Sequence, residues 1–138
     1  MRLVTDYLDD IVRQYPEKIA FANEQDSMTF AQVQESARKV AVGLRMANLF
    51  KQPIIVFMEK SPVCIASFLG AAYSGNFYTP IDTKMPASRI CKIINTLHPA
   101  AVITNHSLSS SAKEIFSGCK VLLYEDLQKN QDDIATVA

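Results

Sequence analysis

The stretch GAAYSGNFYTPID, residues 70–82, decides how the middle of this 138-residue chain folds. Two of its residues, Gly70 and Gly75, are separated by four others, which is the glycine spacing of a phosphate-binding loop. Such a loop follows a strand, opens a helix and continues with Lys and then Ser or Thr. Here Asn76 and Phe77 stand at those positions, and the glycines end a helix-like segment that precedes a strand-like one. The pattern therefore fails as a phosphate-binding loop.

The two glycines are better explained by packing. A helix C-terminus carries a partial negative charge, so a phosphate group is repelled there. We expect Gly70, with Ala71 and Ala72, to let the helix lie close to the sheet, and Gly75 to cap the helix end. The chain holds four glycines in all, and none forms a dinucleotide-binding G-x-G-x-x-G pattern.

Hydrophobic periodicity extends outward from this stretch on both sides. Helical spacing predicts helices at 3–13, 29–46, 61–75, 86–97 and 107–118. Short apolar or β-branched runs predict strands at 18–23, 27–30, 53–58, 77–81, 100–104 and 120–124. From residue 53 the two types alternate, which predicts the α/β class with a mostly parallel sheet flanked by helices. Residues 1–124 then form one α/β unit, and residues 125–138 form a polar tail.

Several polar residues are predicted to fix the ends of these elements. Thr29 and Gln32 have the spacing of a capping box, and Ser61 followed by Pro62 marks a second helix start. Asp82 follows a strand, at the edge where open α/β sheets bind ligands, or it bonds the amides of the next turn. We favour the turn for Asp82.

Candidate catalytic and metal-binding side chains are few. His98 is expected to end a helix, and His106 to lie in a turn before the serines at 109–111, which should cap and enter the next helix. Ser107, His98 and Asp82 supply the side chains of a hydrolase triad, but no G-x-S-x-G elbow accompanies them. Neither histidine has cysteine or acid neighbours at metal-ligand spacing. These residues indicate an α/β domain without a complete active site.

Composition excludes several classes of function. Lys and Arg total 14 and Asp and Glu total 14, so neither nucleic acid nor an anionic membrane is an expected partner. The N-terminus carries acids where a signal peptide is apolar, and no apolar run reaches the roughly 20 residues of a membrane span. The paired acids Asp9–Asp10 and Asp132–Asp133 are expected to face solvent. Three widely spaced cysteines, Cys64, Cys91 and Cys119, suit a reducing, cytoplasmic location.

The order of the segments resembles that of the adenylate-forming, AMP-binding enzymes. Residues 15–44 resemble the family's opening, in which a P-x-x-x-A strand leads to a hydrophobic-Thr-aromatic pattern and a long helix. Residues 56–82 resemble its A-G-x-x-Y-x-P-hydrophobic-D signature, and residues 85–104 its P-x-x-R-hydrophobic helix and next strand. These motifs are most similar in form to those of nonribosomal peptide synthetase adenylation domains and D-alanine–carrier-protein ligases. The matching residues are Met28, Thr29, Phe30, Val33, Ser74 (where the family usually has Ala), Gly75, Tyr78, Pro80, Ile81, Asp82, Pro86, Arg89 and Ile90.

The resemblance implies a fold, the N-terminal subdomain of these enzymes, and an activity for a parent enzyme. The family uses ATP and magnesium to convert a carboxylate into an acyl-adenylate, and passes the acyl group to the thiol of coenzyme A or of a carrier protein. Its phosphate loop, magnesium glutamate, ribose-binding aspartate and C-terminal lysine have no counterpart in these 138 residues. Residues 132–135, DDIA, resemble the stretch before that loop. The resemblance therefore assigns no catalytic, cofactor-binding or metal-binding residue to this chain.

Three hypotheses follow. We expect a truncated N-terminal portion of a carboxylate-activating ligase, inactive alone, whose partner is the remainder of the parent enzyme; ATP and magnesium are expected only for that parent. The alternative is a freestanding, catalytically inactive binding module of the same fold, which forms a homo-oligomer through exposed edges and apolar patches. A flavodoxin-like or phospho-receiver domain is disfavoured, because Glu59 is a single acid after its strand and Asp82 lies close to Pro80.

Overall fold

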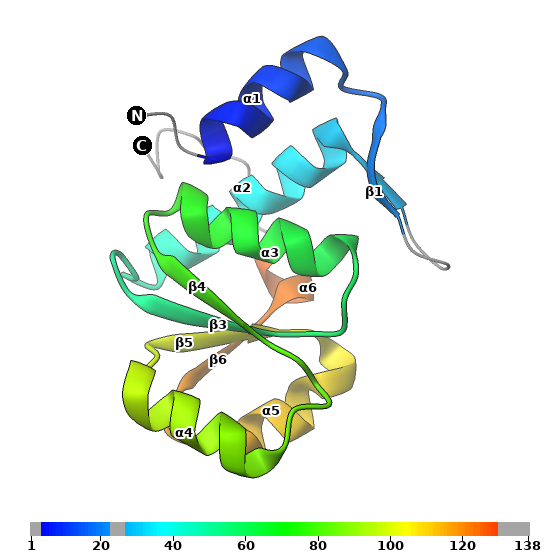
Figure 1. Cartoon of the computed structure of the whole chain (residues 1–138). Coiled ribbons are helices and arrows are strands. Elements are labelled where there is room, and N and C mark those ends of the chain that lie inside the picture. The colour runs from blue at the N-terminus through cyan, green and yellow to red at the C-terminus, as the bar shows by residue number, and fades with distance from the viewer. Residues whose placement is uncertain (1–3, 23–26, 130–138) are drawn as a thin grey trace.

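The computed structural model describes residues 4–22 and 27–129, and Figure 1 shows helices packed on both faces of a small sheet. The helices are α1 (Val4–Gln14), α2 (Phe30–Met46), α3 (Pro62–Tyr73), α4 (Ala87–Leu97), α5 (Ser109–Ile115) and α6 (Tyr124–Leu127), with a 3-10 turn η1 (His106–Leu108). The strands are β1 (Ile19–Ala22), β2 (Ser27–Thr29), β3 (Pro53–Phe57), β4 (Phe77–Ile81), β5 (Ala101–Thr104) and β6 (Lys120–Leu123).

The central sheet is parallel and has the strand order β4-β3-β5-β6. In its register, Ile54 of β3 lies opposite Tyr78 of β4 on one side and Ala101 of β5 on the other. The chain passes from β3 to β4 and then crosses to β5 on the far side of β3, which is a doubly wound arrangement. The strands β1 and β2 form a separate antiparallel pair. The predicted α/β class with a mostly parallel sheet is confirmed.

Strand β3 is buried on both faces, as its uninterrupted apolar run predicted. Ile54 and Val56 pack with α2 and α3 on one face of the sheet. Ile55 and Phe57 pack on the other face with α4 and α5, where the rings of Phe57 and Phe116 meet edge to face with centroids 5.4 Å apart. The two faces are covered by different helices, α2 and α3 on one side and α4 and α5 on the other (Figure 1).

Two predicted helix starts are confirmed in atomic detail. The Thr29 hydroxyl accepts a hydrogen bond from the Gln32 amide at 3.2 Å, and the Gln32 side chain accepts one from the Thr29 amide at 2.8 Å. The Ser61 hydroxyl accepts a hydrogen bond from the Cys64 amide at 3.2 Å, and Pro62 is the first residue of α3. These caps satisfy amides that a helix cannot pair internally.

Helix α5 differs from its prediction at both ends. The serines at 109–111 form its first turn but none of them caps it. The side chain of Asn105 caps η1 instead, accepting a hydrogen bond from the Leu108 amide at 3.1 Å. Because η1 runs directly into α5, its carbonyl groups take the place of a serine cap. The helix also ends at Ile115 rather than near Gly118, and Phe116 turns into the core.

The first residues of the predicted polar tail, 125–138, belong to α6 in the structure. Leu127 is only 6% exposed and belongs to the core cluster on the α2 face. The Gln128 side chain donates a hydrogen bond to the Ser36 carbonyl of α2 at 3.0 Å. Residues 124–128 are thus packed against the rest of the chain. The paired acids Asp132–Asp133 lie outside the described residues.

Candidate functional site

Gly70 brings α3 close to α2. A Cβ atom at this position would lie 2.5 Å from the Val40 Cβ and 2.8 Å from the Ala37 carbonyl oxygen, both on α2. The predicted close contact was with the sheet, and the structure corrects it, because the atoms that leave no room for a side chain belong to the neighbouring helix. A glycine is needed where two backbones approach this closely.

Gly75 ends α3, as predicted. Its φ of +81° lies in the left-handed region that favours glycine. Its amide donates to the Ala72 carbonyl at 3.1 Å, and the Asn76 amide donates to the Ala71 carbonyl at 2.9 Å, which together form a Schellman motif. Both amides are used within the helix end, so neither is available to a phosphate oxygen. The stretch 70–82 closes a helix and starts the edge strand β4.

The residues present do not fit ATP and magnesium. Among residues 4–22 and 27–129, no group of three His, Cys, Asp or Glu side chains is placed to hold a metal ion. The only glycine pair with phosphate-loop spacing is the packing and capping pair just described. No step of nucleotide chemistry is therefore assigned to these residues.

An apolar cavity of about 510 Å³ opens at the carboxyl edge of the parallel sheet. It lies where β3 and β4 end, between the start of α3 and the turn after β4. Its deep lining includes the buried side chains of Val56, Met58 and Cys64, and its polar lining residues are Lys60, Ser61 and Asp82. Open doubly wound sheets bind their ligands at this edge, which makes the cavity the candidate site.

Local hydrogen bonds hold two walls of this carboxyl-edge cavity in place. On one side, the cap of the Cys64 amide by Ser61 fixes the first turn of α3. On the other side, the Asp82 carboxylate accepts a hydrogen bond from the Lys84 amide at 2.9 Å, and the Asp82 carbonyl accepts one from the Met85 amide at 3.0 Å. The predicted turn role of Asp82 is confirmed.

The chemical groups in the carboxyl-edge cavity suit binding and not catalysis. Burial raises the pKa of the Cys64 thiol to about 11, so it stays protonated near neutral pH and is a weak nucleophile. The Ser61 hydroxyl is engaged by the Cys64 amide, and none of the described lining residues is a histidine. Within the described ranges, neither the Ser61 hydroxyl nor the Cys64 thiol is hydrogen-bonded to a basic side chain, so the site shows no activated nucleophile.

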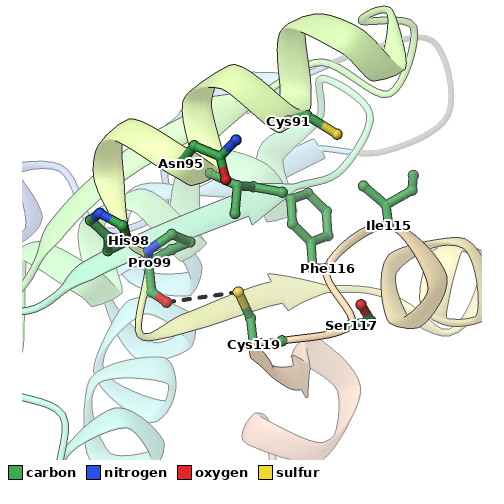
Figure 2. Close-up of a pocket in the computed structure, with 10 residues that line it drawn as sticks. Cys91, Asn95, His98, Pro99, Ile115, Phe116, Ser117 and Cys119 are labelled. Atoms are coloured by element: carbon green, nitrogen blue, oxygen red, sulfur yellow. Dashed lines mark hydrogen bonds between the residues drawn. The ribbon is translucent and has the colours of Figure 1, made fainter.

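A second cavity, of about 400 Å³, lies between α4 and the segment that follows α5 (Figure 2). Cys91 and Cys119 both line it. The Cys119 thiol donates a weak hydrogen bond to the Pro99 carbonyl at 3.7 Å, and burial raises the pKa of this thiol. His98 is seven residues after Cys91, which is about 10 Å along a helix axis, so its ring is too far to activate the Cys91 thiol.

The triad that the sequence offered is not assembled. Asp82 precedes α4 and His98 ends it, and the 11 residues of α4 span about 16 Å. Ser107 donates its hydroxyl hydrogen bond to the Asn105 side chain at 2.9 Å. His98 adopts a φ of +51° at the end of α4 and His106 begins η1, which are the structural positions predicted for both histidines.

A polar cluster that the sequence did not reveal joins α1 to α2 and α3. One oxygen of the Asp9 carboxylate accepts hydrogen bonds from the Tyr73 hydroxyl and the Gln34 side chain, both at 2.6 Å, and Arg38 lies 3.7 Å away. Burial and the bond to Asp9 raise the pKa of Tyr73. The prediction that Asp9 faces solvent holds only in part, because its side chain is 34% exposed and its carboxylate is turned toward α2 and α3. Its partners lie 25 and 64 positions away, so no local pattern marks them.

Two further observations concern the environment of the protein. Within the described ranges, no helix is both long and apolar enough to span a membrane. Cys64, Cys91 and Cys119 are all free thiols. The cytoplasmic location stays a prediction.

Sequence comparison identifies relatives of the chain. A family model described as AMP-binding enzyme matches residues 8–137. A D-alanine--D-alanyl carrier protein ligase of Staphylococcus aureus strain MRSA252 is 34% identical over 121 residues, which is 86% of this chain and 23% of that protein. The protein of that name from strain Newman is 33% identical with the same coverage. The chain spans about a quarter of the length of the curated relatives it matches.

Solved structures share the fold. A benzoate CoA ligase from Burkholderia xenovorans LB400 has a TM-score of 0.82 at 21% identity, over 95% of this chain and 29% of that chain. The nonribosomal peptide synthetase FmoA3, in its α-methyl-L-serine-AMP bound form, has a TM-score of 0.86 at 20% identity, over 99% of this chain and 15% of that chain. The fold is that of the N-terminal subdomain of adenylate-forming enzymes, as predicted. Because the family model covers nearly the whole sequence, the chain belongs to the AMP-binding enzyme family.

Proposed function

We propose that these residues are the N-terminal part of an ATP-dependent ligase that activates a carboxylic acid as its adenylate. The family match over residues 8–137 carries the proposal. Relatives named D-alanine--D-alanyl carrier protein ligases, at 33–34% identity, favour an amino acid as the acid and a carrier-protein thiol as the acceptor. ATP and magnesium belong to the parent ligase in this proposal, because the residues described here do not fit them.

The contribution of this part is structural. The parallel sheet has its core closed on both faces by helices. Every buried side-chain nitrogen and oxygen atom in the described ranges has a hydrogen-bond partner. In the carboxyl-edge cavity, no hydrogen bond in the described ranges joins the Ser61 hydroxyl or the Cys64 thiol to a basic side chain, and we expect the isolated residues to be catalytically silent.

Amino-acid-dependent ATP–pyrophosphate exchange tests this proposal. The protein from its native source is compared with the isolated 138-residue chain, with D-alanine, L-alanine and benzoate as acids. We expect exchange by the native protein with one of the amino acids and none by the isolated chain. Exchange by the isolated chain after rigorous purification would contradict the claim of silence, and a native protein that exchanges with no acid would contradict the ligase assignment.

A binding or oligomerisation module is the second candidate, and the open edge of β4 favours it. Phe77 is 63% exposed and Tyr78 is 45% exposed on this strand, which has no neighbour on its outer side in the described sheet. We expect the isolated chain to dimerise at high concentration through this edge, and Phe77→Lys to weaken the dimer. Light scattering that gives a monomer mass at every concentration would exclude self-association through this edge.

A further inference from the structure

The carboxyl-edge cavity has the size and character of a small-molecule site. Its volume of about 510 Å³ lies in the range of about 300–1,000 Å³ that such sites occupy. Met58 and Met85 contribute thioethers, which adapt to ligands of irregular shape. Phe68, on the α3 wall, is held by stacking on the ring of Tyr78 with centroids 5.0 Å apart. An apolar ligand would release water from this surface.

The walls of the carboxyl-edge cavity are formed before any ligand arrives. The Ser61 cap fixes the start of α3, and the two hydrogen bonds of Asp82 fix the turn on the opposite side. A site whose walls are already ordered loses less conformational entropy on binding. These bonds also engage the Ser61 hydroxyl and the Asp82 carboxylate. Both residues therefore shape the cavity more than they contribute hydrogen bonds to a ligand.

The charges at the cavity select the kind of ligand. Lys60 and Asp82 are its charged lining residues. The Asp82 carboxylate is engaged by the Lys84 amide, whereas Lys60 is exposed and forms no ion pair with any residue in the described ranges. A ligand with one negative charge would neutralise Lys60, and a second negative charge would be repelled by Asp82.

We propose that the carboxyl-edge cavity binds a small apolar molecule with a single anionic head group, the apolar body lying against Val56, Cys64 and Phe68 and the head group beside Lys60. The proposal assigns no nucleotide contact to this cavity, because its lining residues hold neither a phosphate loop nor a metal group. The head group is a carboxylate, a sulfate or a sulfonate, since Lys60 recognises a point charge rather than a particular geometry.

Fluorescence titration with 8-anilinonaphthalene-1-sulfonate, an apolar dye with one negative charge, tests the site on the 138-residue chain. We expect one dye molecule per chain, displaced by decyl sulfate and by decanoate but only weakly by decanol or by a dicarboxylate of the same length. Binding of many dye molecules without saturation would overturn the proposal. So would displacement by decanol as strong as that by decyl sulfate.

Three variants separate the apolar and charged parts of the site. Lys60→Met should weaken the binding of the dye and of decyl sulfate about fivefold, which is the usual contribution of a partly exposed charge pair, and should leave the binding of decanol unchanged. Lys84→Met is the matched control, since Lys84 carries the same charge in the adjoining turn without lining the cavity. It should leave the binding of all three ligands unchanged. Ile65→Trp should fill the cavity and abolish binding of all three, with cooperative thermal unfolding confirming that each variant folds. Equal effects of Lys60→Met and Lys84→Met, or full binding by Ile65→Trp, would refute the site.

Discussion

At the level of single residues, Gly70 lies where α2 and α3 leave no room for a methyl group. Alanine here would place its Cβ 2.5 Å from Val40 and force α2 and α3 apart. We expect Gly70→Ala to lower the free energy of unfolding by about 1–3 kcal/mol, the usual cost of overpacking, and the melting temperature by several degrees. Gly118→Ala is the control, because nothing lies within 4 Å of a Cβ at that position. Equal melting temperatures for the two variants would contradict the close helix contact.

Cys64 should make the stability of the chain sensitive to alkaline pH. Burial raises its pKa from the ordinary 9.0 to about 11, so the folded state keeps the thiol neutral where the unfolded state ionises. This contribution to stability is complete below about pH 9 and is lost as the pH rises to about 11. Between those values, the wild type should lose about 2 kcal/mol more of its unfolding free energy than Cys64→Ala. Urea unfolding at both pH values measures the difference, and parallel losses in the two proteins would disprove the buried thiol.

At the scale of elements, the start of α5 distinguishes a cap seen in the structure from one expected in the sequence. Asn105 accepts the amide of Leu108, while Ser110 lies in the first turn without capping it. Asn105→Ala should cost about 1 kcal/mol of unfolding free energy, and Ser110→Ala close to nothing. Chemical denaturation of the two variants makes the comparison. A larger loss of unfolding free energy in Ser110→Ala than in Asn105→Ala would show that a serine caps this helix start.

Helix α1 is tied to the rest of the molecule by the cluster around Asp9. Tyr73→Phe removes the 2.6 Å hydrogen bond between the Tyr73 hydroxyl and the Asp9 carboxylate while keeping the ring. We expect a loss of about 1 kcal/mol in unfolding free energy and faster amide exchange in α1. Tyr78→Phe is the control, because no hydrogen bond of the Tyr78 hydroxyl is found in the described ranges, and it should leave both measurements unchanged. Unaltered exchange in α1 of Tyr73→Phe would show that the cluster does not hold this helix.

At the scale of the whole molecule, local chemistry explains which features were predictable. The capping box at Thr29, the start of α3 at Ser61 and the turn at Asp82 depend on residues at most a few positions apart, and the sequence predicted all three. The contact of Gly70 with Val40 and the bond of Asp9 to Tyr73 depend on how helices distant in the chain pack together. Sequence patterns predicted neither. The carboxyl-edge cavity depends on the relative placement of α3 and the turn after β4, so Asp82 was noticed there but Lys60 and Cys64 were not.

The same contrast applies to function. Three short motifs in the right order predicted the family, and the match over residues 8–137 confirmed it. None of these motifs supplies a nucleophile, a base or a phosphate contact, because in this fold Gly70 packs a helix and Gly75 ends it. Membership of the family therefore rests on the pattern of the scaffold, and the chemistry of the parent ligase is expected elsewhere in its chain.

We propose that this scaffold is one part of a larger ligase. The intact mass of the native polypeptide, captured with an antibody against residues 27–129 and measured by mass spectrometry, tests it most directly. We expect a mass several times the 15.3 kDa of the 138 residues, since they match 23% of the length of their curated relatives. A native mass near 15.3 kDa would contradict it and would leave the binding module as the function of this chain.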